Sequence, residues 1–219
     1  DLRACSPAAP GGDPWLVPVG VDADDLATAH LDLRHHHAVV AGPPRSGVTT
    51  ALSTIAAAFD AAHLLTSRDP VADGAGGPQV WASAREWSEA AWAELLGAVE
   101  RDAAAGRRTL LALDRFCELV ELPGASVLED ELARLLRSAA GTPLRVVVGG
   151  DADGLLRCYS DVATRLRGGR TGLLLQPDPD LHAGLLQASL PRRDELPACA
   201  GRGWVLGPGT ATPLQVAVP

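Results

Sequence analysis

The stretch AVVAGPPRSGVTT, from Ala38 to Thr50, decides the fold of this chain. It opens as a short apolar strand, passes through a glycine, four further residues and a second glycine, and then enters a helix-forming run. That GxxxxG spacing is typical of a Walker A loop, in which backbone N–H groups form a nest for phosphate oxygens and the following helix adds its positive end. The sequence therefore predicts nucleotide contacts from Gly42, Pro43, Pro44, Arg45, Ser46, Gly47, Val48, Thr49 and Thr50.

The loop lacks the lysine that normally stands between the second glycine and the hydroxyl residue, because Val48 occupies that position. All nineteen basic residues of the chain are arginines, so no lysine from elsewhere in the chain can take its place. Losing one charged contact to a polyphosphate costs about 2–4 kcal/mol, or roughly 30- to 1,000-fold in affinity. We therefore expect ATP and Mg²⁺ to bind weakly or not at all.

A second apolar run, TLLALD (109–114), ends in Asp114, where a Walker B aspartate stands. Asp114 and the Thr49 hydroxyl are the expected Mg²⁺ ligands if nucleotide binds. The next residue is usually acidic in active enzymes of this kind and orients the attacking water, but here it is Arg115. With the lysine and the general base both missing, we assign no catalytic residue and predict little or no ATPase activity from this chain alone.

Apolar strands alternate with helical runs along the rest of the chain. This order predicts an α/β fold of the P-loop NTPase (RecA-like) type, with a mostly parallel sheet, helices on both faces and short C-terminal strands at 203–208 and 214–218. Residues 1–14 are rich in proline and glycine and are predicted to be a linker or N-terminal arm, and 15–219 the domain. Residues 15–22 are predicted to be an edge strand, where Pro18 is tolerated. Helices are expected at 49–62, 86–105, 127–140 and 154–166.

Composition narrows the functional classes. The net charge of −8 is a poor match for a DNA backbone, so no DNA partner is expected. Cys5, Cys117, Cys158 and Cys199 are scattered without a CxxC pair, which favours free thiols in a reducing compartment. The histidines at 35–37 are expected in a loop that enters a strand rather than in a metal site. No run of about 18 apolar residues predicts a membrane span, so the chain is expected to be a soluble piece of a longer protein.

Three segments resemble a known family. VPVGVDADDLATAHLDL and HHAVVAGPPRSGVTTAL resemble the opening of FtsK/SpoIIIE-type motor domains, and LPRRDELPACAGRGWVLGPGTATPLQVAV resembles their ending. The AGPPRSG loop is most similar to the ATPase modules of EccC/EssC-type proteins of type VII secretion and of related actinobacterial proteins. The resemblance implies a cytoplasmic module of a membrane-anchored protein, with other modules of the same chain as partners and assembly as a hexamer through the parent.

The resemblance also implies that terminal modules of the secretion branch bind the C-terminal signal of small helical secreted proteins. Two hypotheses remain open. The first is a degenerate module that binds a secreted protein or regulates neighbouring modules, and the second is a DNA or protein translocase module that hydrolyses ATP. Tryptophan is favoured at binding hot spots, so Trp81 and Trp204 are candidate partner contacts, whereas Trp87 and Trp92 share a predicted helix and could equally be core residues.

Overall fold

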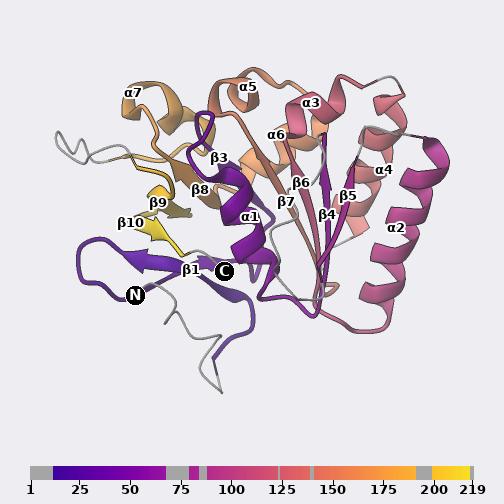
Figure 1. Ribbon diagram of the computed structural model, residues 1–219, viewed down its shortest axis with the longest axis horizontal. Helices are drawn as coiled ribbons and strands as arrows, with labels where there is room; N and C mark the ends of the chain where they lie inside the picture. The colour runs from indigo at the N-terminus through magenta and orange to yellow at the C-terminus, as the bar shows by residue number, and fades with distance from the viewer. Residues whose placement is uncertain are drawn as a thin grey trace.

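A ten-stranded mixed sheet runs through this computed structural model, which describes residues 12–67, 79–83, 88–122, 124–138, 141–190 and 199–217. The strand order is β2-β1-β10-β9-β8-β3-β7-β6-β4-β5. Strands β8, β3, β7, β6, β4 and β5 form one block, and β9, β10, β1 and β2 extend the sheet on the side of β8 (Figure 1). The strands are β1 Leu16–Asp22, β2 Thr28–Asp32, β3 Ala38–Ala41, β4 Ala61–Thr66, β5 Gln79–Ser83, β6 Thr109–Asp114, β7 Leu144–Gly150, β8 Gly172–Leu175, β9 Arg202–Gly207 and β10 Thr210–Val216.

The prediction of a mostly parallel sheet is wrong. Strands β8, β3, β7, β6, β4 and β5 are parallel, whereas β2, β1, β10 and β9 pair antiparallel with one another and β9 pairs antiparallel with β8. The chain's first and last hairpins join through β1 and β10 and cover what would be the free edge of β8. Strand β1 is therefore not an edge strand, and Pro18 is accommodated at a register irregularity between β1 and β2.

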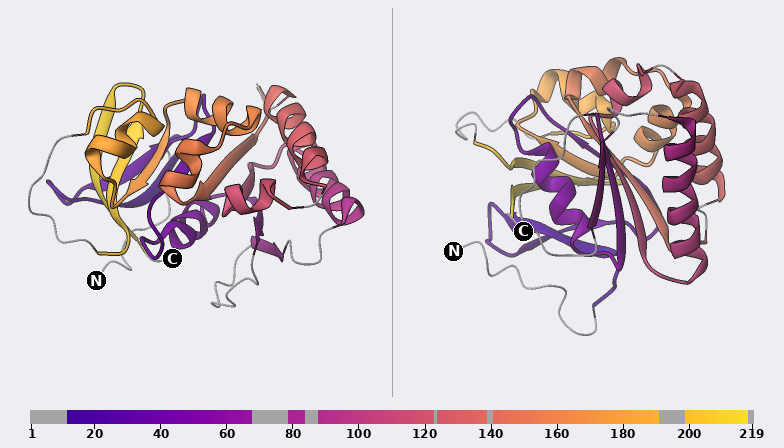
Figure 2. Two further views of the ribbon diagram at one scale, coloured as in Figure 1. Left: turned by 90° about the horizontal axis from the view of Figure 1, so that it is seen from above. Right: turned by 45° about the vertical axis from the view of Figure 1, so that its right-hand side comes forward.

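Helices cover both faces of the sheet, as the sequence predicts (Figure 2). On one face α1 buries Leu52 and Ile55 against β3, β4, β6 and β7. On the other face α2, α4 and α6 bury leucines and valines against the same strands. The helices are α1 Val48–Ala56, α2 Glu89–Ala104, α3 Phe116–Val120, α4 Ala125–Ser138, α5 Ala152–Arg157, α6 Asp161–Gly168 and α7 Pro179–His182, followed by the 3₁₀ turn η3 Ala183–Leu185.

Two predicted helices change where tertiary structure overrides local preference. Helix α1 stops at Ala56 because the alanine-rich residues from Ala61 enter β4, which pairs in parallel with β6. The helix expected at 154–166 is divided into α5 and α6. Ser160 starts α6 by accepting a hydrogen bond from the backbone N–H of Ala163. The short helices α3 and α7 were not predicted.

The carboxyl ends of the parallel strands lie together at the upper edge of Figure 1. The loop after β3, Asp114 at the end of β6 and the start of α5 after β7 all lie at this edge. The predicted strands at 38–41, 109–114 and 144–150 are confirmed residue for residue. The histidines at 35–37 lie in a loop before β3, as expected. Most of the predicted arm at 1–14 lies outside the described residues.

Candidate functional site

The loop between β3 and α1 is a tight turn that only glycine can begin. The Gly42 N–H donates to the Gly150 carbonyl oxygen at 3.2 Å, and the Ser46 N–H donates to the Pro43 carbonyl oxygen at 3.1 Å. A Cβ on Gly42 would lie 2.4 Å from Ser46 Oγ and 2.7 Å from the Leu175 carbonyl oxygen. The loop therefore folds closely over the ends of the strands beside β3.

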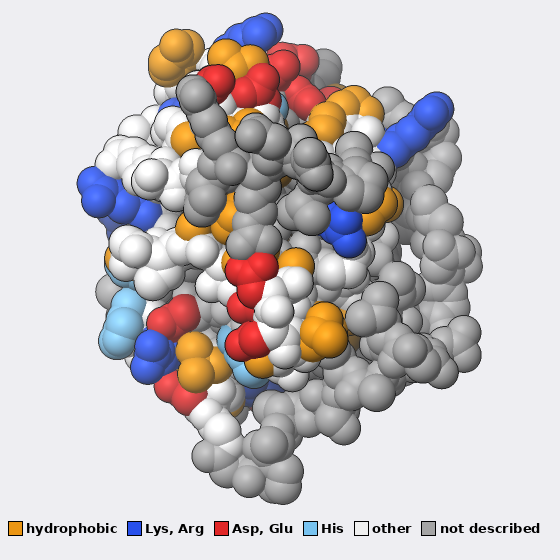
Figure 3. Space-filling model, turned by 90° about the vertical axis from the view of Figure 1, so that its left-hand side faces the viewer, with side chains coloured by type: hydrophobic (Ala, Val, Ile, Leu, Met, Phe, Trp, Pro, Cys, Tyr) orange, Lys and Arg blue, Asp and Glu red, His pale blue; other side chains and the backbone are white. Residues whose placement is uncertain are grey.

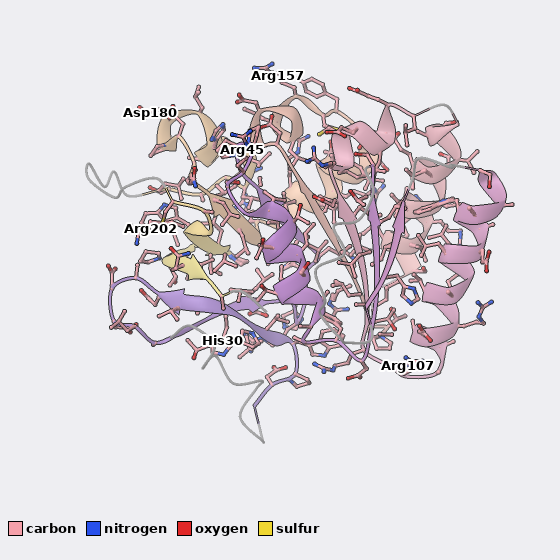
Figure 4. All side chains as sticks on the ribbon, viewed as in Figure 1. His30, Arg45, Arg107, Arg157, Asp180 and Arg202 are labelled. Carbon is pink, nitrogen blue, oxygen red and sulfur yellow. The ribbon has the colours of Figure 1, made fainter. Side chains whose placement is uncertain are left out.

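The start of α1 is open as an anion-binding site. Gly47 stands at the N-cap with a φ of 100°, and neither a side-chain cap nor an acidic residue in the first turn occupies this helix end within the described residues. The first N–H groups of a helix have no partner inside the helix, and they carry the positive end of its dipole. Arg45 adds a positive charge at the tip of the loop, also with a positive φ of 67° (Figure 4).

The C-terminal segment holds the loop from behind. The Gly201 N–H donates to the Ser46 carbonyl oxygen at 2.7 Å, and a Cβ on Gly47 would lie 3.0 Å from the Gly201 nitrogen. Ser46 is only 1% exposed, and its hydroxyl has no hydrogen-bond partner among the described residues. A buried hydroxyl without a partner is costly, so the loop retains an unsatisfied polar group on its inner side, next to Gly42.

Thr49 and Asp114 meet as the sequence predicts. The Thr49 hydroxyl donates to Asp114 Oδ2 at 2.9 Å, and the Arg115 N–H donates to Asp114 Oδ1 at 3.0 Å. Burial raises the pKa of the Asp114 carboxyl, and the bonds from Thr49 and Arg115 oppose that shift. A hydroxyl and a carboxylate side by side fit a Mg²⁺ ion that takes its other ligands from phosphate and water. The described residues hold no group of three or more histidine, cysteine, aspartate or glutamate side chains suited to a metal.

Val48 and Arg115 occupy the two positions that depart from an active site. Val48 is partly buried and packs against the apolar cluster under α1, where its Cγ1 lies 3.0 Å from a Cβ built on Gly149. Arg115 takes a left-handed conformation, with a φ of 55°, and starts α3. Its guanidinium donates to Glu118 Oε1 at 3.0 Å. Neither side chain supplies the charge that the usual residue at its position would supply.

Glu118 is a carboxylate at this edge that the sequence analysis missed. It lies on α3, where Arg115 and the hydroxyl of Ser67 both donate to it. Its negative charge raises the pKa of Asp114, which places the two carboxyls within electrostatic reach. The sequence spacing could have identified it, because a short helix that starts just after β6 places Glu118, four residues after Asp114, back near the end of that strand. The helix itself was not predicted.

Of the four tryptophans considered as partner contacts or core residues, two are buried and two have side chains outside the described part of the chain. Trp204 lies on β9, is 7% exposed and packs in the core, so it does not present an exposed surface for a partner. Trp81 lies on β5, but its side chain is outside the described part of the chain. Trp92 is 2% exposed and belongs to the core, the alternative raised above, and Trp87 lies outside the described residues.

No protein-family model and no curated protein matches the sequence, but solved structures match the fold. The cytoplasmic domain of EssC matches with a TM-score of 0.70 at 18% identity, over 98% of this chain and 45% of that chain. The cytoplasmic domain of the Thermomonospora curvata type VII secretion ATPase EccC matches with a TM-score of 0.70 at 20% identity, over 99% of this chain and 28% of that chain. This chain has the fold of the EssC and EccC ATPase domains.

A third structure of this kind contains a peptide. It is Thermomonospora curvata EccC (ATPases 2 and 3) in complex with a signal sequence peptide, with a TM-score of 0.67 and 22% identity over 97% of this chain and 43% of that chain. The chain thus spans less than half the length of each of these three EccC and EssC structures. The resemblance drawn from the sequence is confirmed at the level of the fold. No helix in the described ranges is long and apolar enough to cross a membrane.

Proposed function

We propose that this chain is a degenerate P-loop module of a type VII secretion motor of the FtsK/SpoIIIE type. Its role is to bind a secreted protein substrate or to regulate neighbouring ATPase modules rather than to hydrolyse ATP. The observation that carries this proposal is Val48, whose apolar side chain packs towards Gly149 where an active site extends a lysine to the phosphates. The module is a cytoplasmic part of a membrane-anchored parent, assembled as a hexamer through that parent.

The candidate nucleotide site has the backbone geometry of a Walker A loop but lacks the lysine charge. The uncapped N-terminal end of α1 and the Thr49–Asp114 pair support binding of a phosphate group and Mg²⁺. Without the lysine, the binding free energy of ATP is less favourable by about 2–4 kcal/mol. The dissociation constant is then well above the micromolar range of an ordinary site. Bound nucleotide in this module is therefore a weak structural ligand, and Thr49 and Asp114 would hold its Mg²⁺.

Phosphate release from Mg²⁺-ATP tests the catalytic part of the proposal. We expect the native chain to turn over far more slowly than about 1 per second, the low end of ordinary enzyme rates. Asp114→Ala serves as the matched control, because it removes the Walker B carboxylate and reveals any contaminating ATPase. A rate near that value that disappears in Asp114→Ala contradicts the proposal.

A secreted helical protein is the proposed partner. The peptide complex of the EccC relative supports this, since that protein has the same fold and binds a signal sequence peptide. Strongly exposed large hydrophobic residues in the described ranges lie on separate elements, at Leu26, Val127, Tyr159 and Leu181. On the face seen in Figure 3, hydrophobic side chains are likewise interspersed with charged ones. These residues form no shared apolar groove of the kind into which an amphipathic helix docks, so the peptide complex of the EccC relative is the observation that supports this partner.

Fluorescence anisotropy with labelled C-terminal tails of small secreted helical proteins encoded near this chain tests the partner. We expect binding tighter than about 100 µM, which corresponds to roughly 5.5 kcal/mol, and none for the same residues in scrambled order. Equal binding of the natural and scrambled tails contradicts specific recognition. Absence of binding by every natural tail leaves only the regulatory role, which then requires contact with neighbouring ATPase modules.

A second candidate function, an ATP-hydrolysing DNA or protein translocase module, is favoured by one observation. Glu118 provides a carboxylate near Asp114 even though Arg115 follows the strand. If this carboxylate orients water, Glu118→Gln abolishes phosphate release, while Glu121→Gln, one turn further along, leaves it unchanged. The net charge of −8 argues against duplex DNA as the substrate. Tight binding to random-sequence DNA with a steep salt dependence would restore the DNA translocase.

A further inference from the structure

The fold brings together two cysteines that lie far apart in the sequence. Cys117 is in α3 and Cys158 directly follows α5. Both are half-buried free thiols that pack against the same core cluster. The Cys117 sulfur lies over α5, where it is 3.4 Å from a Cβ built on Gly154, and Cys158 stands at the C-terminal end of the same helix, four residues after Gly154.

The surroundings of Cys158 favour its thiolate. It lies just before α6, whose N-cap is Ser160, so the positive end of that helix faces it. Arg167 is held beside it, because its guanidinium donates to the Cys158 carbonyl oxygen at 2.9 Å and to the carbonyl oxygens of Leu155 and Leu156 at 3.1 and 3.0 Å. The hydrogen bond from Cys117 and then those from Ser160, together with the Arg167 charge, lower the pKa of Cys158 to about 5 against the opposing effect of burial.

Cys117 has the opposite preference. Its hydrogen bond to Cys158, its burial and the negative charges of Cys158, Asp151 and Glu121 all raise its pKa. These opposite shifts favour the thiolate at Cys158 and the thiol at Cys117, and both side chains lie against α5. Reactive cysteines are partly exposed and lie beside a cation, as Cys158 lies beside Arg167, and redox-sensitive ones have a second cysteine alongside.

We propose that Cys158 is an oxidation site for hydroperoxides and that Cys117 is its resolving cysteine. The Cys158 thiolate attacks the O–O bond of the peroxide, which forms a sulfenic acid and releases the other oxygen as water or alcohol after it takes a proton from solvent. The Cys117 sulfur then attacks the Cys158 sulfur. An S–S bond forms, the S–O bond breaks, and the hydroxyl leaves as water with the proton of Cys117. Two thiols lose two electrons in total, and one peroxide gains them.

The site is accessible and lies at the functional edge. Tyr159, next to Cys158, is 87% exposed, so this turn is at the surface. Arg157, on its other side, projects from the same upper edge of the molecule as Arg45 of the P-loop (Figure 4). Arg115, the residue after Asp114, is the N-cap of α3, so the disulfide would tie the segment behind the Walker B position to the turn between α5 and α6. The inference holds whether or not the loop binds nucleotide.

Hydrogen peroxide at a small excess over protein tests the site, with the products read by non-reducing peptide mapping. We expect a disulfide between Cys117 and Cys158 in the native chain and in Cys199→Ser, the control that removes an exposed thiol elsewhere. In Cys117→Ser the sulfenic acid at Cys158 persists and is trapped by dimedone. In Cys158→Ser no disulfide involving Cys117 forms.

A measurement on the native chain keeps the test independent of folding in the variants. At pH 6, iodoacetamide should modify Cys158 several-fold faster than the exposed Cys199, because the thiolate is the reacting form. Slower modification of Cys158 than of Cys199, or peroxide oxidation that passes to the sulfinic acid without a disulfide, overturns the proposal.

Discussion

Replacing Val48 by lysine should restore nucleotide binding to the loop. The backbone nest, the open end of α1 and the Thr49–Asp114 pair are already in place, so the missing contribution is the charge on the phosphates. That contact is worth about 2–4 kcal/mol, or roughly 30- to 1,000-fold in affinity. Removing the Val48 methyl groups from their packing beside Gly149 costs the fold about 1 kcal/mol, which is smaller than the expected gain in binding.

A thermal-shift titration with Mg²⁺-ATP measures this change. At a fixed ATP concentration that nearly saturates the variant, a hundredfold gain in affinity adds up to about 2.7 kcal/mol of stability. For a domain of this size that corresponds to a rise of roughly 5–10 °C in Tm above the ligand-free variant. Val48→Gln is the matched control, because its side chain is long and polar but carries no charge.

Two results would refute this reasoning. If Val48→Lys gains no more from ATP than Val48→Gln does, the backbone of the loop is not a phosphate nest and the loop never had that function. If the native chain binds ATP with sub-micromolar affinity, the charge is supplied from another residue, and Arg45 at the tip of the loop is the first to replace.

The remaining predictions concern stability, measured by urea unfolding. Burial lowers the pKa of His37 to about 4, so the unfolded chain binds its proton first and the fold loses up to about 3 kcal/mol as the pH falls from about 6.5 to 4. His37→Asn keeps an acceptor for the backbone N–H that the imidazole now binds, and it should remove this loss. Gly42→Ala should cost about 2 kcal/mol or more through its backbone contact, whereas Gly168→Ala, which meets nothing within 4 Å, should be neutral. Arg145 donates to four backbone carbonyl oxygens and lies 4.2 Å above the ring of Trp15, so Arg145→Lys should destabilise by about 2 kcal/mol. An unchanged midpoint for Gly42→Ala or Arg145→Lys, or an acid loss that persists in His37→Asn, would contradict the corresponding contact.

The sequence by itself determined the features that depend on neighbouring residues. Continuous apolar runs predicted β3, β6 and β7 with their correct ends, since strands buried on both faces are apolar at most positions and their few polar residues lie near the ends. The glycine spacing predicted the loop, and an acid at the end of a strand predicted the partner of Thr49, which the 2.9 Å hydrogen bond confirms. A loop tied to one strand and one helix can be inferred locally.

The tertiary structure decided what depends on pairing across the chain. Strands β1 and β10 meet from opposite ends of the sequence, and their antiparallel pairing converts a parallel sheet into a mixed one. The sequence of a single strand does not indicate which other strand will pair with it at the edge of a sheet. The direction of the Val48 side chain and the meeting of Cys117 with Cys158 have the same origin. Each is set by packing between elements far apart in sequence. The hydrophobic effect is not directional, so it does not specify which apolar residues meet, and the order of the strands in the assembled sheet decides which residues become neighbours.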